Sequence, residues 1–467
     1  MSRPLPPSLR DAVRAPYWLD RAEAPGRREP VDDGAECDLL VIGAGFTGLW
    51  AAWRALERDP ERSVMIVDSE TVGHGATGRN GGFVSASLTH GYAHGEALWP
   101  DDMASITAEG RNNLAAMADD LRGAGIDCDF RVVGKTTVAI EPWQVDALRS
   151  THALAERYGE TVEWQDREQV QADVHSPTYL AGVRDRTGNA LVDPARMAWG
   201  MAAHLEQRGA RIHEDSRIDR FSRSGADVVA HTPDGRRVRA RQAVIATSAY
   251  RSPLARLGGY IMPLYDHVLM TEPLTAEQRA SIGWAEAQGL TDAGNQFHYY
   301  RLTADDRILW GGWDAVYHRG GALDDELGYA GDSHALLAEQ FVETFPSLRD
   351  VRFSHRWAGP IDSTTRFTAA YGTALGGRVA YAIGHTGLGV GAARFSAEVA
   401  LDMLDGTDSA RLQYGIVRRR PMPIPPEPFR NPIIQFTRRS IIAADARGGR
   451  RNLWLRTLDR LGLGFNS

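Results

Sequence analysis

Residues 43–48, which read GAGFTG, constrain the fold of this chain more than any other segment. They lie between a short apolar run at residues 37–42 and a run with helical apolar spacing at residues 46–57, and residues 63–67 are again short and apolar. This order predicts a βαβ unit whose parallel strands are buried on both faces. In a G-x-G-x-x-G turn the glycines permit the tight turn, the approach of a pyrophosphate and the packing of helix on strand. Asp68 ends the second strand, where a carboxylate can bind a ribose, so the segment predicts a dinucleotide site.

Two further glycine-rich turns indicate which dinucleotide is bound. Residues 73–82 read GHGATGRNGG, and bare backbone of this kind can wrap closely around a ligand. Residues 384–390 read GHTGLGV and open a helix, whose N-terminus would stabilise the negative charge of a reduced flavin. Three such turns along one chain suit FAD, which is longer than NAD and has a ring system that is held separately.

Together these segments resemble the D-amino-acid oxidase/glycine oxidase (DAO) superfamily of FAD enzymes over about residues 36–405. The residues that carry the resemblance are GAGFTG, the acidic strand end, GATGRNGG, the VDP helix start at residues 192–194, AVIAT at residues 243–247, and GHTGLGVGAARFSAEVALDML. GATGRNGG is most similar to the branch of gamma-glutamylputrescine oxidoreductase-like amine oxidases. The resemblance implies an α/β protein in which a Rossmann-like FAD-binding domain of the glutathione-reductase type is interleaved with an α+β substrate domain built on an antiparallel sheet.

The expected domain boundaries follow from this resemblance. They are an N-terminal arm at 1–35, an FAD-binding domain at 36–100, 185–255 and 355–410, a substrate domain at 101–184 and 256–354, and a basic extension at 411–467.

The resemblance also implies which residues contact the cofactor. Gly43, Gly45, Phe46, Thr47 and Gly48 would bind the pyrophosphate, Asp68 and Ser69 the ribose, and Ile218 the adenine, with Thr247 beside them. Gly75, Ala76, Thr77, Gly78, Arg79, Asn80, Gly81 and Gly82 would line the isoalloxazine, and Gly384, Thr386, Gly387, Leu388, Gly389 and Val390 would face its pyrimidine end. No cysteine lies near these segments, and Arg79 stands where dimethylglycine-type relatives have a linking histidine, so we expect noncovalent FAD.

Members of the superfamily oxidise a C–H bond next to an amine nitrogen by hydride transfer to flavin N5, giving an imine that hydrolyses to a carbonyl compound. The candidates for the catalytic site are His385, His267, Arg301, Tyr300 and Trp313. Arg301 could bind a substrate carboxylate or form a structural ion pair, and His267 could accept a proton or fill the core. Trp310 and Trp313 could enclose a cationic amine or fill the core, and His385 could act through its backbone. Residues 298–301 alternate across a strand, so His298 and Tyr300 share one face, and Tyr299 and Arg301 share the other.

Oxygen is the expected electron acceptor, with hydrogen peroxide as product, although a dehydrogenase stays possible. Sarcosine oxidase-like relatives place a lysine on the strand next to the flavin, whereas the similar strand here, at residues 308–310, has none. The alternatives are an FAD- and NADPH-dependent hydroxylase and a noncatalytic flavin- or anion-binding protein. The hydroxylase family normally has a Gly-Asp pair where this chain has Gly384 and His385.

Charge is divided unevenly along the chain. Lys135 is the one lysine among 53 basic residues, and the net charge is −7. Residues 411–467 carry 12 arginines against three acidic residues, so the body is acidic and the extension basic. Such an extension could bind nucleic acid, but we expect it to pack on the acidic body, with no nucleic-acid partner.

The remaining expectations concern the compartment and the partners of the chain. The two cysteines suit a reducing compartment, and we expect no metal site. No apolar run is long enough to span a membrane, so a cytoplasmic enzyme acting on a small amine or amino acid is expected. The sequence does not indicate the oligomeric state.

Overall fold

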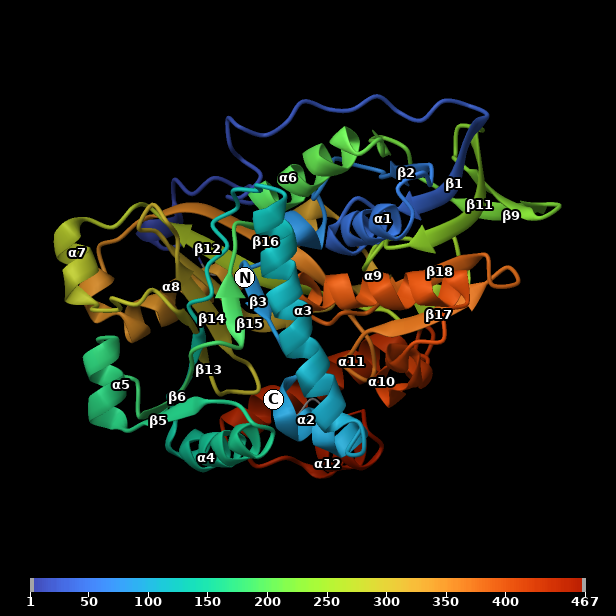
Figure 1. Cartoon of the computed structure of the whole chain (residues 1–467). Coiled ribbons are helices and arrows are strands. Elements are labelled where there is room, and N and C mark those ends of the chain that lie inside the picture. The colour runs from blue at the N-terminus through green and yellow to red at the C-terminus, as the bar shows by residue number, and fades with distance from the viewer. Residues whose placement is uncertain (1–3, 464–467) are drawn as a thin grey trace.

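The computed structural model describes residues 4–463 of the chain. Two large sheets lie toward opposite ends of the molecule, with helices packed around them, and the chain passes between the sheets several times (Figure 1). Among the described residues, no helix has the length and apolar character needed to cross a membrane. This mixed α/β architecture confirms the expected fold class.

The first sheet grows from the predicted βαβ unit and has the strand order β17-β18-β11-β1-β2-β8. From β18 to β8 all neighbouring strands are parallel, which explains the continuous apolar runs of β2, β18 and the second half of β1. β17 adds an antiparallel edge, and β9 and β10 extend β11 as an antiparallel ribbon. The strands are β1 Ala35–Ile42, β2 Val64–Val67, β8 Arg211–His213, β9 Arg220–Ser224, β10 Asp227–His231, β11 Arg237–Ile245, β17 Ala370–Ala374 and β18 Val379–Ile383.

Helices α1 (Phe46–Arg58) and α9 (Gly389–Asp405) pack against each other on one face of this sheet. Their apolar side chains belong to one core cluster, and Arg54 of α1 pairs with Glu398 of α9 at 2.5 Å. Because both helices follow parallel strands directly, their N-termini open at the same edge of the sheet.

The second sheet has the order β16-β12-β15-β14-β13-β4-β6-β5 and is antiparallel except where β13 pairs with β4. One face packs on α8, where aromatic side chains form a core. Its strands are β4 Lys135–Ala139, β5 Val162–Gln165, β6 Ala181–Asp185, β12 Met262–Thr271, β13 Gly289–Asp292, β14 His298–Leu302, β15 Ile308–Val316 and β16 Phe353–Ser363. A separate pair is formed by β3 Phe83–Ser85 and β7 Asn189–Leu191.

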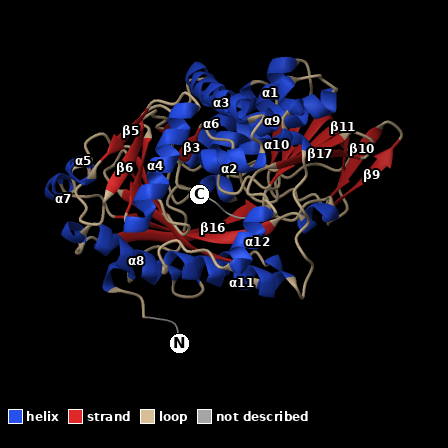
Figure 2. Ribbon diagram, turned by 90° about the horizontal axis from the view of Figure 1, so that it is seen from below, coloured by secondary structure: helices blue, strands red, loops and turns tan. Residues whose placement is uncertain are grey.

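The helices surround both sheets, as seen from below in Figure 2. Besides α1 and α9 they are α2 Gly91–Leu98, α3 Met103–Gly123, α4 Pro142–Arg157, α5 Arg167–Asp173, α6 Pro194–Gln207, α7 Ala276–Ser281, α8 Ser333–Thr344, α10 Gly415–Arg418, α11 Arg430–Asp445 and α12 Leu453–Arg460. At α6, Asp193 caps the helix by accepting a hydrogen bond from the Arg196 N–H, and Pro194 occupies the first turn, as its sequence indicates.

Two elements cross the domain boundaries expected from the sequence. β16 begins at Phe353 and pairs along its length with β12, so residues 355–363 belong to the second sheet rather than to the first. α3, which falls in the expected substrate segment, buries Leu114, Met117 and Leu121 in the core that α1 and α9 share.

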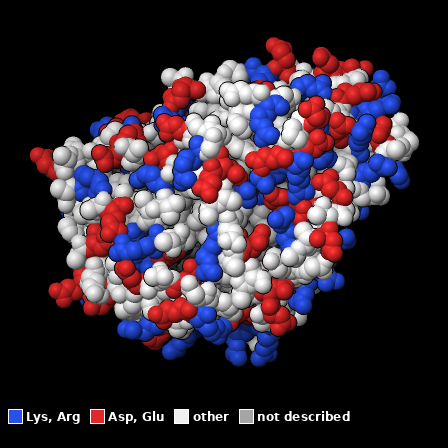
Figure 3. Space-filling model, viewed as in Figure 1, with Lys and Arg blue, Asp and Glu red and all other residues white. Residues whose placement is uncertain are grey.

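Both terminal segments lie against the body. In the N-terminal arm, Trp18 is buried and Arg21 pairs with Asp193. In the C-terminal extension, Asp445 accepts hydrogen bonds from the Asn295 side chain (2.6 Å) and the Gln296 N–H (3.1 Å), and Arg438 pairs with Asp314. On the face shown in Figure 3, acidic and basic side chains are interspersed, consistent with ion pairs between the segments.

Candidate functional site

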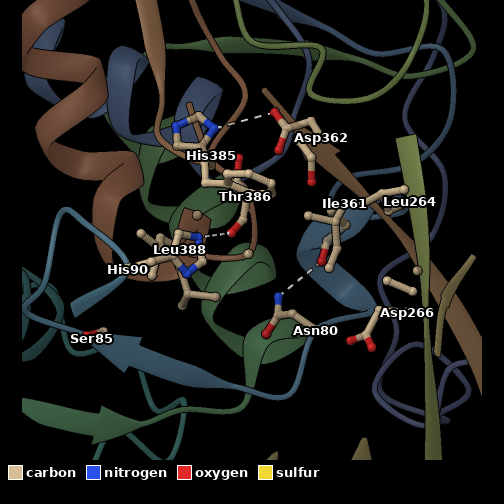
Figure 4. A pocket seen from close by; sticks show the side chains of 18 of the residues that line it. Asn80, Ser85, His90, Leu264, Asp266, Ile361, Asp362, His385, Thr386 and Leu388 are labelled. Carbon is tan, nitrogen blue, oxygen red and sulfur yellow. Dashed lines mark hydrogen bonds and ion pairs between the residues drawn. The ribbon is translucent and has the colours of Figure 1, made fainter. Parts of the chain in front are cut away.

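A cavity of about 1050 Å³ lies between the N-termini of α1 and α9 and the second sheet. The three glycine-rich turns supply one side of it, and the face of the second sheet that does not pack on α8 supplies the other. Figure 4 shows part of this cavity, with Asn80, Thr386 and Leu388 from the turns and Leu264 and Asp266 from β12. Turns that are hundreds of residues apart in the sequence therefore meet at one cavity.

The first turn leaves the N-terminus of α1 open to the cavity. Gly43 has a φ of 109°, and a Cβ there would lie 2.4 Å from the Ala246 carbonyl oxygen, so only glycine fits. α1 has no side-chain cap, although the Phe46 N–H donates to Thr77 Oγ1 at 3.0 Å. The other N–H groups of the first turn and the positive end of the helix dipole can therefore bind an anion.

Asp68 lies beside this turn at the end of β2. Its carboxylate accepts hydrogen bonds from the Ala44 N–H (2.6 Å) and the Glu70 N–H (2.9 Å). Burial nevertheless raises the pKa of this carboxyl above its usual range, because little water reaches it. Ile218, the expected adenine contact, lines the same end of the cavity.

The turn from β18 into α9 supplies a second open helix end. Asp362 holds this turn by accepting a hydrogen bond from the Gly384 N–H at 2.7 Å, and His90 Nε2 bonds the Thr386 carbonyl at 2.8 Å. The His385 imidazole bonds Ser396 Oγ at 3.0 Å and lies 3.6 Å from Asp362, so its ring is engaged within the turn (Figure 4). The backbone of this turn, more than the imidazole, is therefore available to a ligand.

Long-range contacts fix the remaining glycine loop at residues 75–82. The Trp18 indole donates to the Asn80 carbonyl at 2.9 Å, and the Trp357 indole donates to the Arg79 carbonyl at 2.8 Å. Arg301 donates to the Val192 carbonyl at 2.6 Å and to the Gly82 carbonyl at 3.3 Å. Two tryptophans and one arginine, all outside the loop, thus set its shape.

The residues present fit FAD. Two uncapped helix N-termini suit its pyrophosphate and its pyrimidine end, and the buried hydroxyl of Thr247, which lines the cavity, has no hydrogen-bond partner among the described residues. Most expected cofactor residues line the cavity, whereas Gly48, Gly78, Gly82 and Gly384 lie behind it. Gly48 is a packing position, because a Cβ there would lie 1.9 Å from the Gly43 carbonyl oxygen.

Opposite the turns, Asp266 and Tyr299 form a polar pair on the second sheet. The Tyr299 hydroxyl donates to Asp266 Oδ2, and both residues line the cavity. Burial raises the pKa of Asp266 to about 7, although part of its side chain faces the cavity. Near neutral pH this carboxyl can therefore hold or release a proton.

Three of the five predicted catalytic residues lie outside the cavity lining, which corrects the sequence analysis. His267 faces α8, where its ring packs edge-on against His334 at 5.0 Å and burial lowers its pKa to about 3. Tyr300 faces the same core, and its hydroxyl bonds that of Tyr179 at 2.6 Å. Arg301 is engaged by backbone carbonyls and lies 3.5 Å from Asp129, so it has the structural role rather than that of a substrate clamp.

Trp313 and His385 do line the cavity. Trp313 stacks on His298 with ring centroids 5.5 Å apart, whereas Trp310 is buried against Tyr300. The expected pair of tryptophans around an amine is therefore not formed.

The sequence analysis missed several residues of this site. Asp266 and Tyr299 are direct neighbours of residues that it chose, and the strand alternation was the signal that could have found them. Lys135 also lines the cavity, as do Ile433, Ile434 and Trp454 of the C-terminal extension. Within residues 4–463, no group of three or more His, Cys, Asp or Glu side chains could hold a metal ion.

Comparisons with known proteins agree with this geometry. A sequence model of the family described as "FAD dependent oxidoreductase" matches residues 38–403. Gamma-glutamylputrescine oxidoreductase of Escherichia coli K12 is 28% identical over 397 residues, which cover 84% of this chain and 88% of that protein. A sarcosine oxidase subunit beta of Arthrobacter is 22% identical, with 70% and 76% covered. The crystal structure of glycine oxidase from Geobacillus kaustophilus has a TM-score of 0.68 at 19% identity and covers 80% of this chain and 96% of its own.

Proposed function

The chain belongs to the FAD-dependent oxidoreductase (DAO) family, and from this premise we propose that it oxidises the carbon–nitrogen bond of a small amine or amino acid. The observation that carries the proposal is the Asp266–Tyr299 pair, which faces the glycine turns across the cavity. The names of the relatives support the substrate class, because one is an oxidoreductase of gamma-glutamylputrescine and another is a subunit of sarcosine oxidase.

FAD, when bound, would accept the electron pair and the hydrogen that leave the carbon next to the nitrogen. The resulting iminium would add water and divide into a carbonyl compound and an amine or ammonia. Gly43, Gly45 and the open end of α1 would hold the pyrophosphate, and residues 386–390 would face the electron-rich end of the ring.

The chain itself would manage the proton of the substrate. An amine enters as an ammonium, whose nitrogen lone pair is unavailable until one proton has left. The Asp266 carboxylate can accept that proton, since its pKa of about 7 matches the task near neutral pH. Tyr299, by donating to Asp266, favours the ionised carboxylate and fixes its orientation.

Anaerobic reduction of the bound flavin tests the proposal. The holoenzyme is mixed with a panel of primary amines, secondary amines and amino acids, without NADPH, and the visible flavin absorbance is followed. Bleaching by one class of amine is expected. If only NADPH bleaches the flavin, the protein is a hydroxylase, and if neither does, the catalytic proposal fails.

Admitting oxygen to the reduced enzyme then separates an oxidase from a dehydrogenase. We propose oxygen as the acceptor, so fast reoxidation with stoichiometric hydrogen peroxide is expected. Slow reoxidation that a quinone or dye accelerates would instead identify a dehydrogenase.

We also propose that FAD is held noncovalently. Cys37 and Cys128 are buried and neither lines the cavity, while Arg79 forms an ion pair with Asp325 at 2.8 Å. Acid precipitation should leave the flavin in the supernatant. Flavin that stays with the precipitated chain contradicts this.

A further inference from the structure

The one lysine of the chain lies on the cavity wall, far along the sheet from Asp266. Lys135 is on β4, and β15, β14 and β13 separate that strand from β12. Four strand spacings correspond to roughly 19 Å along the sheet. The other 52 basic residues of the chain are arginines, so Lys135 is the one lysine side chain that could contact a ligand here.

A row of cavity-lining side chains connects the two positions. Tyr299 pairs with Thr291 across β14 and β13, and Thr291 pairs with Thr137 of β4. Lys135 is two residues from Thr137, so both point to the same face of the sheet, and all of these side chains line the cavity. An extended molecule lying on this face could therefore contact Asp266 at one end and Lys135 at the other.

The ammonium of Lys135 has unused hydrogen-bond donors. Its ladder partner is Asp185, but among the residues described no carboxylate oxygen lies within 4.0 Å of the ammonium nitrogen. The Asp185 carboxylate is already occupied, because it accepts bonds from the Thr187 N–H (3.0 Å), the Gly188 N–H (2.8 Å) and the Asn189 side chain (2.8 Å). Burial lowers the pKa of Lys135, and the charge of Asp185 opposes this only in part.

The other neighbouring groups do not compensate the charge of Lys135. Glu160 also lines this part of the cavity, but it pairs with Arg111 at 2.9 Å. Burial lowers the pKa of His90 to about 3 and raises that of Tyr92, so both are neutral at physiological pH. The donors of Lys135 therefore face a cavity wall whose two nearby carboxylates, Asp185 and Glu160, are already hydrogen-bonded to other groups.

We propose that Lys135 binds a carboxylate at the end of the substrate remote from the reacting nitrogen. The inference rests on the proposed amine oxidation and narrows it to amines whose chain carries a carboxylate several bonds away. The three N–H donors of a lysine can bind such a carboxylate by charge-assisted hydrogen bonds.

Matched pairs of amines test the preference. The holoenzyme is reduced anaerobically by ω-amino acids of four, eight and twelve carbons, each compared with the n-alkylamine of the same length. We expect the carboxylated member to bind more tightly, and the preference to grow with length until the chain reaches Lys135.

Three variants separate the carboxylate contact from other roles. In Lys135→Met the preference should vanish while reduction by the alkylamines is unchanged, and Lys135→Arg should keep part of the preference. Arg149→Met is the matched control, since it removes an exposed cation of α4 that does not line the cavity, and it should leave the preference intact.

Binding of octanoate, which cannot be oxidised at an amine, gives a readout independent of turnover. Calorimetry should show its dissociation constant rising about tenfold or more in Lys135→Met, the effect of losing a charged hydrogen bond. Retained flavin absorbance and an unchanged melting temperature would show that Lys135→Met is folded. If Lys135→Met does not fold, Lys135→Gln is used in its place.

Several outcomes would overturn the inference. The inference fails if octanoate binds Lys135→Met as tightly as the wild type. It also fails if Lys135→Met loses equal activity toward the ω-amino acid and the alkylamine of each pair. If Lys135→Met slows reoxidation by oxygen but keeps the carboxylate preference, the lysine acts in the reaction of the reduced flavin with oxygen instead. If octanoate binding depends on Lys135 but no amine bleaches the flavin, the carboxylate site stands and the proposed function fails.

Discussion

On β12 the side chains of Asp266 and His267 point to opposite faces of the second sheet, one to the cavity and one to α8. The same holds on β14 for Tyr299 and Tyr300. The alternation is visible in the sequence, but which face meets the cofactor turns depends on where α8 packs. A sequence alone therefore predicts two sets of residues. His267 was the wrong choice on β12, whereas on β14 the candidates Tyr300 and Arg301 came from both faces and neither lines the cavity.

Replacing Asp266 by Asn should slow flavin reduction by amines about a hundredfold or more, the usual contribution of a positioned proton acceptor. In the wild type, the carboxylate form is needed, so the rate should rise with pH through about 7 and then level off. Anaerobic stopped-flow measurements from pH 5 to 9 check this, and Asp266→Asn should lack the inflection.

Tyr299→Phe refines the same prediction, because the Tyr299 hydroxyl stabilises the ionised carboxylate. Its loss should raise the pKa of Asp266 and shift the inflection to higher pH. Asp305→Asn is the matched control for Asp266→Asn, because Asp305 lies in the turn after β14 and outside the cavity lining. It should keep the wild-type inflection. An unshifted inflection in Tyr299→Phe would assign the pH dependence to another group.

Gly45→Val should abolish retention of FAD. A Cβ at this position would lie 3.0 Å from Thr77 Oγ1, so the added methyls would disturb the bond from the Phe46 N–H and fill the approach to α1. The ratio of flavin absorbance to protein absorbance after purification measures this. Gly26→Val, where nothing lies within 4 Å of the added Cβ, should keep its flavin, and a flavin-replete Gly45→Val would refute the pyrophosphate site.

At the scale of elements, the glycine turns were predictable because their signals are local. GAGFTG and GHTGLGV each join a strand to a helix within a few residues, and the structure places both beside the cavity. The residues that hold the glycine-rich segments were not predictable from local pattern. Trp18 and Trp357 hold the loop at residues 75–82, and Asp362 holds the turn before α9. The packing of the extension on the body was expected, but its share in the cavity wall was not.

A shortened chain that ends at Arg420 tests whether the C-terminal extension forms part of the cavity wall. It lacks α11 and α12 but keeps the carbonyls of Ile416 and Arg419 that bind Arg366. We expect FAD to be retained, because the glycine turns are intact, while iodide quenches flavin fluorescence more strongly and the KM for amines rises several-fold. Arg456→Gln, on the exposed side of α12, is the control and should behave as wild type. If iodide quenches the shortened chain no more than the wild type, the extension does not shield the site.

At the scale of the whole molecule, the sequence predicted one FAD held by turns near residues 45, 78 and 387, and the comparisons confirm the FAD family to which this arrangement belongs. It could not predict that β16 joins the second sheet, because its pairing with β12 spans about 90 residues of chain. Nor could it predict that Arg301 bridges Gly82 and Val192, which are far from it in sequence. Such contacts depend on the assembled fold rather than on local pattern.

FAD should therefore stabilise the molecule as a unit. The loop at residues 75–82, an expected FAD contact, is held by Trp357 and Arg301 of the second sheet, so FAD binding should be coupled to both sheets. A ligand that binds only the folded chain raises the free energy of unfolding, by about 2.7 kcal/mol at a hundredfold excess over Kd. Calorimetric scans of apoprotein with increasing FAD should show one transition moving upward. A transition that stays in place, or one that splits so that only part responds, would contradict this coupling of FAD binding to both sheets.

The cavity wall formed by α11 and α12 also has a consequence for biosynthesis. A ribosome makes residues 43–390, which include every glycine turn, before it makes residues 422–463. While the later residues are still missing, the cavity lacks that wall. Until α11 and α12 have folded onto the body, this side of the cavity is therefore open to a molecule as large as FAD.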